Sequence, residues 1–252
     1  IDIKHVFEAQ NIATSGWNFT SSDSVLSFSF WVKSSVAQNF FGHIKTFDGT
    51  VYNYPFSTGS LTADTWTKVT KTIPGNSNLT INNDNGQGLE IRFLLFAGTN
   101  YTASVSEDAW VAYDNTQRSP DNTSTWYTTK DRTFFITGVQ LEVGQHASEF
   151  IHEPYERTLA KCQRYYAEKE LHQSYMDSNA DSAQYLGYDL PVTQRADGTG
   201  SVITQVQYWS GGVPTNVTPN VYPKTDHIRI TTSGLTSARG IVSGRIASDA
   251  EL

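Results

Sequence analysis

The sequence predicts an all-β protein: a jelly-roll β-sandwich, a single connecting helix and a small C-terminal β domain. Charged residues make up only 17% of the 252 residues, while Ser, Thr, Asn and Gly are abundant. This composition is typical of short strands joined by many turns. Several stretches alternate apolar and polar residues with the period of two of a pleated strand. No strand–helix–strand rhythm is present, so a sandwich is expected rather than a parallel sheet.

The N-terminal strands are predicted from this alternation and from the turns between them. In the first of them, Leu26, Phe28, Phe30 and Val32 share one face, and Asp48-Gly49 indicates a hairpin between the next two. Trp31 and Trp66 lie within regular strands, and we expect them to fill the core. Residues 104–131 form a long irregular section. The expected strands are residues 25–32, 40–47, 50–54, 66–73, 89–97 and 134–143.

The last of these strands is expected to close the sandwich. Its alternation predicts one face formed by Phe135, Thr137, Val139, Leu141 and Val143. A helix is expected next, because Pro154 suits a first helical turn. Apolar residues then recur at spacings of four, three and four, which places them in one stripe along a helix. The polar residues 168–181 are expected to end this helix. The stripe consists of Tyr155, Leu159, Cys162 and Tyr166.

The C-terminal part is predicted to return to strands. They are expected at residues 184–190, 201–210, 221–223, 227–232 and 237–248. This C-terminal part has few large apolar residues, so its core is expected to be thin. Association with identical copies, or packing on the first domain, would stabilise it. The predicted domains are therefore residues 1–150 for the sandwich, 151–180 for the helix and linker, and 181–252 for the tip.

The net charge and the absence of certain sequence motifs argue against several classes of function. The net charge of −7 and pI near 5.3 argue against nucleic-acid partners, and no apolar run reaches the ~20 residues of a membrane span. One cysteine cannot form an intrachain disulfide. Nucleophile-elbow and zinc-helix motifs are missing and the six histidines are scattered, so we expect no enzyme, metal site or cofactor. Because the chain begins with Ile1, it is interpreted as a piece of a longer polypeptide.

We interpret the aromatic residues of the long loop and of the tip as candidates for glycan binding. Sugars stack on aromatic faces, while amides and carboxylates fix their hydroxyl groups. Two regions have this mixture, the loop after residue 100 and the tip. For Trp126 and Tyr127 a role in the core remains an equal alternative. The candidate ligand-binding residues are Tyr101, Trp110, Tyr113, Asp114, Trp126, Tyr127, Tyr208 and Trp209.

Two segments carry a resemblance to a known family. Ile136-Thr-Gly-Val-Gln-Leu-Glu-Val-Gly144 and Leu159-Ala-Lys-Cys-Gln-Arg-Tyr-Tyr166 resemble a signature of tail-fibre and receptor-binding proteins of tailed bacteriophages and prophages. The link between them departs from the family pattern, with Ala147-Ser-Glu-Phe-Ile151 in place of Ala-Thr-Pro-Phe-Glu. The calcium site of related modules would need an Asp-Asp pair where this chain has Thr137-Gly138, so no ion is expected there.

The resemblance implies a fold and a role. The fold is a jelly roll similar to carbohydrate-binding modules, followed by a helix and a β tip. The role is host attachment, as a virion protein made in the host cytoplasm and acting outside the cell. Its partners would be other tail proteins and a bacterial surface polysaccharide. Periodicity alone allows the Tyr155–Tyr166 stripe to pack on its own sandwich, while the resemblance favours a homotrimer. A glycan-cleaving depolymerase and a purely structural fibre segment remain the alternatives.

Overall fold

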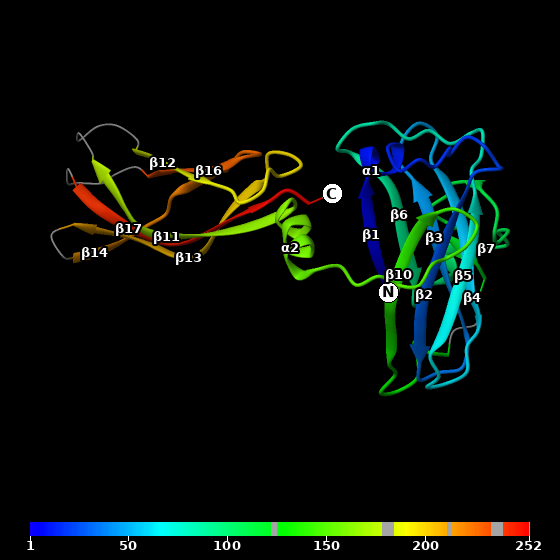
Figure 1. Cartoon of the computed structure of the whole chain (residues 1–252). Coiled ribbons are helices and arrows are strands. Elements are labelled where there is room, and N and C mark those ends of the chain that lie inside the picture. Colours follow the sequence, from blue (N-terminus) through cyan, green and yellow to red (C-terminus); the bar gives the residue numbers. More distant parts are fainter. Residues whose placement is uncertain (122–124, 178–183, 211–212, 233–238, 252) are drawn as a thin grey trace. The chain divides into compact units, whose positions relative to one another are not determined.

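The chain folds into two compact units, Ile1–Ile151 and His152–Leu252, which we call the N-terminal and C-terminal units (Figure 1). The computed structural model describes residues 1–121, 125–177, 184–210, 213–232 and 239–251. Strands dominate both units and pair almost entirely antiparallel, so the all-β class is confirmed. None of the helices in these ranges has the length and apolar character needed to cross a membrane.

The N-terminal unit contains two main sheets. The larger has the order β1-β6-β3-β4-β8 and the smaller β10-β2-β5, and the chain crosses repeatedly between them, in agreement with the expected jelly roll. A short helix, α1 (Ala9–Ala13), follows the first strand. The strands of these sheets are β1 (Asp2–Glu8), β2 (Val25–Ser34), β3 (Asn39–Thr46), β4 (Tyr52–Ser60), β5 (Thr67–Pro74), β6 (Gln87–Leu94), β8 (Val111–Ala112) and β10 (Phe134–Val143).

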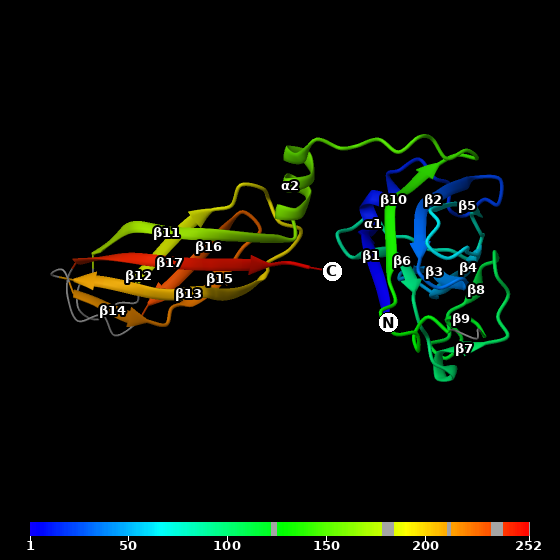
Figure 2. The same ribbon diagram turned by 90° about the horizontal axis from the view of Figure 1, so that it is seen from below.

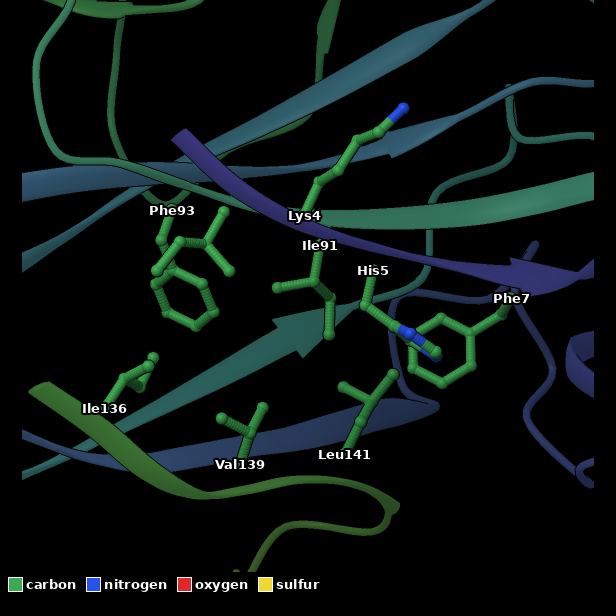
Figure 3. A pocket seen from close by; sticks show the side chains of 9 residues that line it. Lys4, His5, Phe7, Ile91, Phe93, Ile136, Val139 and Leu141 are labelled. Atoms are coloured by element: carbon green, nitrogen blue, oxygen red, sulfur yellow. The ribbon is translucent and has the colours of Figure 1, made fainter. Parts of the chain in front are cut away.

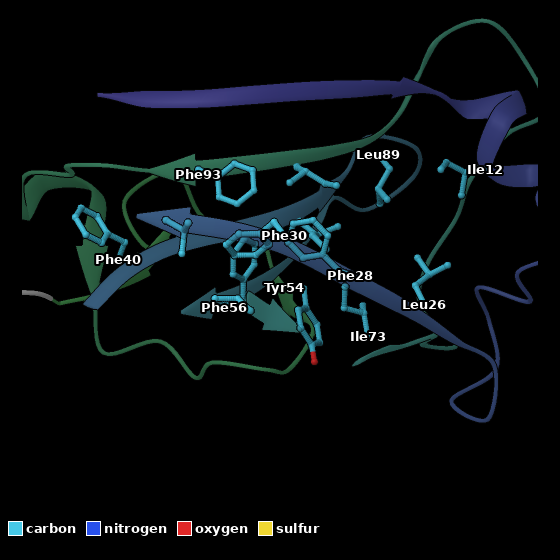
Figure 4. Close-up of a cluster of buried hydrophobic side chains, with 14 of the residues drawn as sticks. Ile12, Leu26, Phe28, Phe30, Phe40, Tyr54, Phe56, Ile73, Leu89 and Phe93 are labelled. Atoms are coloured by element: carbon cyan, nitrogen blue, oxygen red, sulfur yellow. The ribbon is translucent and has the colours of Figure 1, made fainter. Parts of the chain in front are cut away.

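Phenylalanine rings from both sheets form the centre of the core (Figure 4). Phe28 of β2 lies edge-on to Phe56 of β4, with ring centroids 5.3 Å apart, and Phe30 lies 5.0 Å from Phe93 of β6. Such edge-to-face pairs stabilise a core beyond their buried area. The predicted inward face of β2 is confirmed, because Leu26, Phe28, Phe30 and Val32 are all buried.

The expectation that Trp31 and Trp66 fill the core is wrong. Their side chains are 41% and 43% exposed. Trp31 follows the outward phase of β2, between inward-facing Phe30 and Val32, and Trp66 immediately precedes β5. Strand phase, rather than the apolar character of the indole, therefore decides where Trp31 lies.

Strand β10 contains a bulge at Gly138 that its sequence pattern does not reveal. Thr137 pairs with Trp31 and Gln140 with Ser29, so Gly138 and Val139 together face one residue of β2. Gly138 has φ +59°, a conformation that glycine adopts at little cost. The predicted common face of Phe135, Thr137, Val139, Leu141 and Val143 is therefore wrong, because Leu141 pairs with buried Phe28 whereas Phe135 points outward.

The C-terminal unit holds two further sheets, of order β11-β17-β13-β14 and β12-β16-β15 (Figure 2). Leu171, Val206, Ile228, Ile230 and Ile246 form its small buried core. The elements are α2 (Tyr155–Gln163), β11 (Tyr166–Asp177), β12 (Gln184–Asp189), β13 (Thr199–Ser210), β14 (Val213–Val217), β15 (Asn220–Pro223), β16 (His227–Thr232) and β17 (Arg239–Asp249).

Two expectations about the connecting region need correction. Residues 168–177 are not the end of a helix or a linker but belong to β11, which pairs antiparallel with β17. Leu171 is buried in that pairing, so the tertiary contact overrides the polar local sequence. Helix α2 ends at Gln163, and Tyr166 therefore belongs to a strand rather than to the helical stripe. The other stripe residues, Tyr155, Leu159 and Cys162, are exposed.

Candidate functional site

The loop between β6 and β10 is fastened to the larger sheet of the N-terminal unit by several short contacts. Its strands β7 (Thr102–Ala103) and β9 (Ser119–Pro120) pair in parallel, and the amide of Arg118 donates to the carbonyl of Tyr101 at 2.9 Å. The buried side chain of Asn53 in β4 donates from Nδ2 to the carbonyl of Arg118 at 3.3 Å. This loop is therefore held by strand pairing and by a buried amide.

These contacts bring several polar and aromatic side chains together in one cluster. The guanidinium of Arg118 lies over the ring of Tyr101, 4.6 Å from its centroid, and donates from Nε to Asn115 Oδ1 at 3.1 Å. The hydroxyl of Tyr113 donates to the same Asn115 oxygen at 3.1 Å. We call Tyr101, Tyr113, Asp114, Asn115 and Arg118 the Tyr101 surface.

Charges of both signs lie within and beside this surface. Asp114 Oδ1 accepts hydrogen bonds from the hydroxyl and the amide of Thr116, at 2.7 and 2.8 Å, and these bonds lower the pKa of the carboxyl group. Lys45 lies with its ammonium 4.9 Å from the centroid of the Tyr113 ring, and partial burial lowers its pKa. Aromatic, amide, carboxylate and cationic groups are therefore available within one small area.

A buried polar network lies beside Tyr113 on the same sheet. Glu90 of β6 accepts from Arg92 Nε at 2.8 Å and lies 3.3 Å from Nε2 of His43, while the His43 and Tyr113 rings are 6.4 Å apart. Burial lowers the pKa of His43, which favours the neutral imidazole. Burial alone would raise the pKa of Glu90, but hydrogen bonds with His43 and Arg92 outweigh it and lower that pKa. The paired groups contact the Tyr101 surface through the rings of His43 and Tyr113.

The chemistry of the Tyr101 surface suits binding. The exposed ring of Tyr101 can stack on the C–H face of a sugar, and Asn115, Asp114 and Arg118 can contact its hydroxyl groups. Two acids of the loop already have protein partners, since Asp108 pairs with Lys71 at 3.0 Å and Asp114 binds Thr116. Within the described part of the chain, no three His, Cys, Asp or Glu side chains are grouped in a way that could hold a metal ion.

Three other predicted residues lie elsewhere. Trp110 packs against the core beside Tyr54, and its indole donates to the carbonyl of Pro74 at 2.7 Å. Trp126 is only 6% exposed, so the interpretation of this ring as a loop-exposed ligand platform is wrong. Tyr127 is exposed, but its ring stacks on Phe96 at 4.2 Å. The structure thus gathers Tyr101, Tyr113 and Asp114 and separates the two tryptophans from them.

For the candidate residues of the tip, Tyr208 and Trp209, the structure describes the strand pairing of the backbone. Tyr208 and Trp209 belong to β13 and pair with Thr215 and Pro214 of β14. Their side chains lie outside what the structure describes. Tyr222, which borders the same predicted region, is exposed on β15.

A cavity of about 370 Å³ opens between the edge strands β1 and β10 (Figure 3). Ile136, Val139 and Leu141 line it from β10, opposite His5 of β1 and Phe93 of β6. Burial lowers the pKa of His5, so its ring tends to be neutral. This predominantly apolar cavity offers little for sugar hydroxyl groups.

Sequence reasoning missed Arg118 and Lys45. Arg118 is distant in sequence from Tyr101, and their contact depends on the pairing of β7 with β9, two-residue strands with no periodic pattern to read. Lys45 lies in β3, and no motif around it distinguishes it from the other lysines. The tertiary structure places Arg118 beside Tyr101 and Lys45 beside Tyr113, which the local sequence does not predict.

Comparisons with known proteins give little further guidance. No protein-family model matches the chain, and no curated protein matches it significantly. A structural likeness is found to the crystal structure of PBSX exported protein XepA, covering 98% of this chain and 81% of that one. The sequence identity is 9% and the TM-score 0.22, so this weak likeness carries no argument about fold or function.

Proposed function

We propose that this chain is the receptor-binding part of a phage tail fibre, and that its N-terminal unit binds a bacterial surface glycan through the Tyr101 surface. The observation that supports the proposal best is the contact between Arg118 and Tyr101. The cation lies over the ring at 4.6 Å and is also bonded to Asn115. A ligand therefore meets side chains that are already ordered, which reduces the entropy cost of binding.

The same proposal assigns the exposed residues of α2 to a homotrimer. Tyr155 is 74% exposed and Leu159 39% exposed, and no side chain of the helix is buried within the chain. Packing three helices around one axis would bury this side, and covering the part of Leu159 that is still exposed would contribute about 1 kcal/mol per chain. Three weak glycan sites on one assembly would then bind a repetitive surface with much higher avidity.

The proposal places the protein on the virion, outside the host cell, in contact with other tail proteins. Its central test is an array of bacterial capsular polysaccharides, lipopolysaccharide O-chains and teichoic acids. We expect wild-type protein to bind a small set of these glycans, and Tyr101→Ala to lose one or more of them. Binding that is unchanged in Tyr101→Ala would contradict the assigned site, and no binding to any glycan would favour a structural fibre segment.

Cleavage of the glycan is tested separately. Each glycan that binds is incubated with the protein and analysed for new reducing ends. We expect no new reducing ends, because the proposed role of the Tyr101 surface is recognition. New reducing ends would support the depolymerase alternative.

A further inference from the structure

The outer face of the smaller sheet in the N-terminal unit carries a second group of exposed aromatic rings. Trp31 lies on β2, Trp66 just before β5 and Phe135 on β10, and they are 41%, 43% and 46% exposed. Trp66 and Phe135 have ring centroids 6.4 Å apart. Exposed aromatic rings gathered on one face of a soluble domain indicate a binding surface.

Two lysines accompany the rings. Lys33 has its ammonium 5.3 Å from the centroid of Trp66 and 4.9 Å from that of Phe135, and it pairs across the sheet with Phe135. Lys68 pairs with Trp31 on the other side of β2. We call Trp31, Lys33, Trp66, Lys68 and Phe135 the outer aromatic surface. Within the described ranges, neither lysine forms an ion pair with a carboxylate.

The remainder of this sheet face is already covered by the chain itself. Ser27 donates to the carbonyl of Gly144 at 2.7 Å, and Gln140 donates to the hydroxyl of Ser148 at 2.9 Å. Ser27 and Ser29, which share the outward phase of Trp31, are consequently buried. The segment after β10 therefore covers one end of the face. It also brings Phe150 close to Gly138 and Trp31, whose side chain stays 41% exposed.

The nearby carboxylate does not neutralise the lysines by direct contact. Glu142 lies close enough to Lys68 for an electrostatic interaction, but its oxygens accept hydrogen bonds from the Ser148 hydroxyl and amide, at 2.6 and 2.9 Å. The hydroxyl bond is the main reason that the pKa of Glu142 is lowered. The ammonium groups of Lys33 and Lys68 are thus available to an external anion, on a chain whose net charge is −7.

The geometry points to a second glycan site on the outer aromatic surface, selective for acidic polysaccharides whose sugars carry carboxylates. Pyranose rings would stack on Trp31 and Trp66, and carboxylates would pair with Lys33 and Lys68. Local charge complementarity favours this ligand over a second copy of the same surface, because two such surfaces would bring the lysines of both copies together. This site shares no residue with the Tyr101 surface.

The test uses oligomers of polygalacturonate and their fully methyl-esterified form, which keeps the sugar ring and removes the charge. The readout is the pair of indole N–H signals from Trp31 and Trp66 in nuclear magnetic resonance spectra, assigned with Trp31→Phe and Trp66→Phe. The proposal expects both signals to shift with polygalacturonate, and at least tenfold weaker binding of the ester. Alginate and hyaluronate extend the panel of acidic polysaccharides.

Variants separate this site from the Tyr101 surface. Lys33→Gln combined with Lys68→Gln should weaken polygalacturonate binding at least fivefold and reduce its dependence on salt, because fewer ion pairs form. Tyr101→Ala should leave the two indole shifts unchanged, whether or not the proposed host-glycan site is correct. The double lysine variant also keeps both rings, so it controls for any loss of folding in a tryptophan variant.

Three outcomes would overturn the inference. The first is that neither indole signal moves with polygalacturonate, alginate or hyaluronate. The second is equal binding of the acid and its methyl ester. The third is a fall in molar mass by light scattering when Trp31 and Trp66 are both replaced by Ala, which would identify the surface as a contact between copies.

Discussion

The indole N–H of Trp126 donates a hydrogen bond to the carbonyl of Thr133 at 3.1 Å. The Trp126 ring lies edge-on to Phe40 at 6.2 Å, and its backbone amide donates to Gln38 Oε1 at 2.8 Å. Trp126 thus connects the end of the long loop to Phe40 of β3 and to Thr133, which immediately precedes β10. Its role in the structure is to anchor the loop.

Replacing Trp126 should therefore act on stability. Trp126→Ala removes a buried aromatic side chain and leaves a cavity, so the free energy of unfolding should fall by about 3–5 kcal/mol. Urea denaturation measures this change. Tyr127→Ala, an exposed neighbour, is the matched control and should cost less than about 1 kcal/mol. Equal unfolding midpoints for Trp126→Ala and wild type would refute the anchoring role.

Gly138 provides a second test of the fold. Its φ of +59° is costly for other residues, and an added Cβ would lie 3.3 Å from Cδ1 of Trp31. Gly138→Ala should lower the free energy of unfolding by about 1–2 kcal/mol through the backbone conformation. The control is Gly98→Ala, at a position where φ is negative and an added Cβ meets no atom within 4 Å. Similar losses in both variants would show that the bulge is not the cause.

The pair formed by His43 and Glu90 predicts a dependence of stability on pH. The folded-state pKa of His43 lies below its usual value of 6.5, so below about pH 6.5 the unfolded chain takes up a proton that the folded chain resists. The folded-state pKa of Glu90 lies below 4.5, so its stabilising charge is lost as the pH falls through and below that value. Both effects lower stability as the solution becomes more acidic.

Urea midpoints at pH 7.5, 5.5 and 3.5 measure this decline. His43→Gln should reduce the loss between pH 7.5 and 5.5 without abolishing it, because burial also lowers the pKa of His5 and contributes in the same direction. Glu90→Gln should reduce the further loss near pH 3.5. A His43→Gln variant that declines as steeply as wild type between pH 7.5 and 5.5 would exclude His43 as a cause.

Leu159 tests the proposed homotrimer. Leu159→Asp places a charge on the exposed side of α2 and should convert a threefold molar mass into that of a single chain, as measured by light scattering after size exclusion. Thr158→Asp changes the adjacent exposed residue and serves as the control, with the mass expected to stay threefold. A wild-type protein that is monomeric at micromolar concentration would remove α2 from any such contact.

Alternation and turn chemistry allowed much of the fold to be predicted from the sequence. The inward face of β2, the hairpin at Asp48-Gly49 and the interior strand β6 all follow from local patterns that agree with the tertiary structure. The same rule should have placed Trp31 outside, since its neighbours two residues away are Ser29 and Lys33. The size of the indole favours burial, but the alternation of β2 places it on the outer face.

Other features depend on contacts that no local pattern encodes. Trp126 lies among polar residues in sequence, yet Phe40, from a strand far away in the sequence, packs against it together with Phe134. Strand β11 has a polar sequence, and its pairing with β17 joins residues more than sixty positions apart. The candidate site likewise depends on Arg118 reaching Tyr101 through two short paired segments. These features could not be predicted from the sequence, because they depend on pairing between segments that are far apart along the chain.

The most direct test of the proposed function is calorimetric titration of the strongest array glycan, as a short oligosaccharide, into wild type, Arg118→Ala and Tyr127→Ala at equal concentration. We expect at least tenfold weaker binding for Arg118→Ala, which loses both the cation over Tyr101 and the bond to Asn115, and unchanged binding for Tyr127→Ala. Unchanged affinity in Arg118→Ala, with its unfolding midpoint equal to that of wild type, would contradict glycan recognition by the Tyr101 surface.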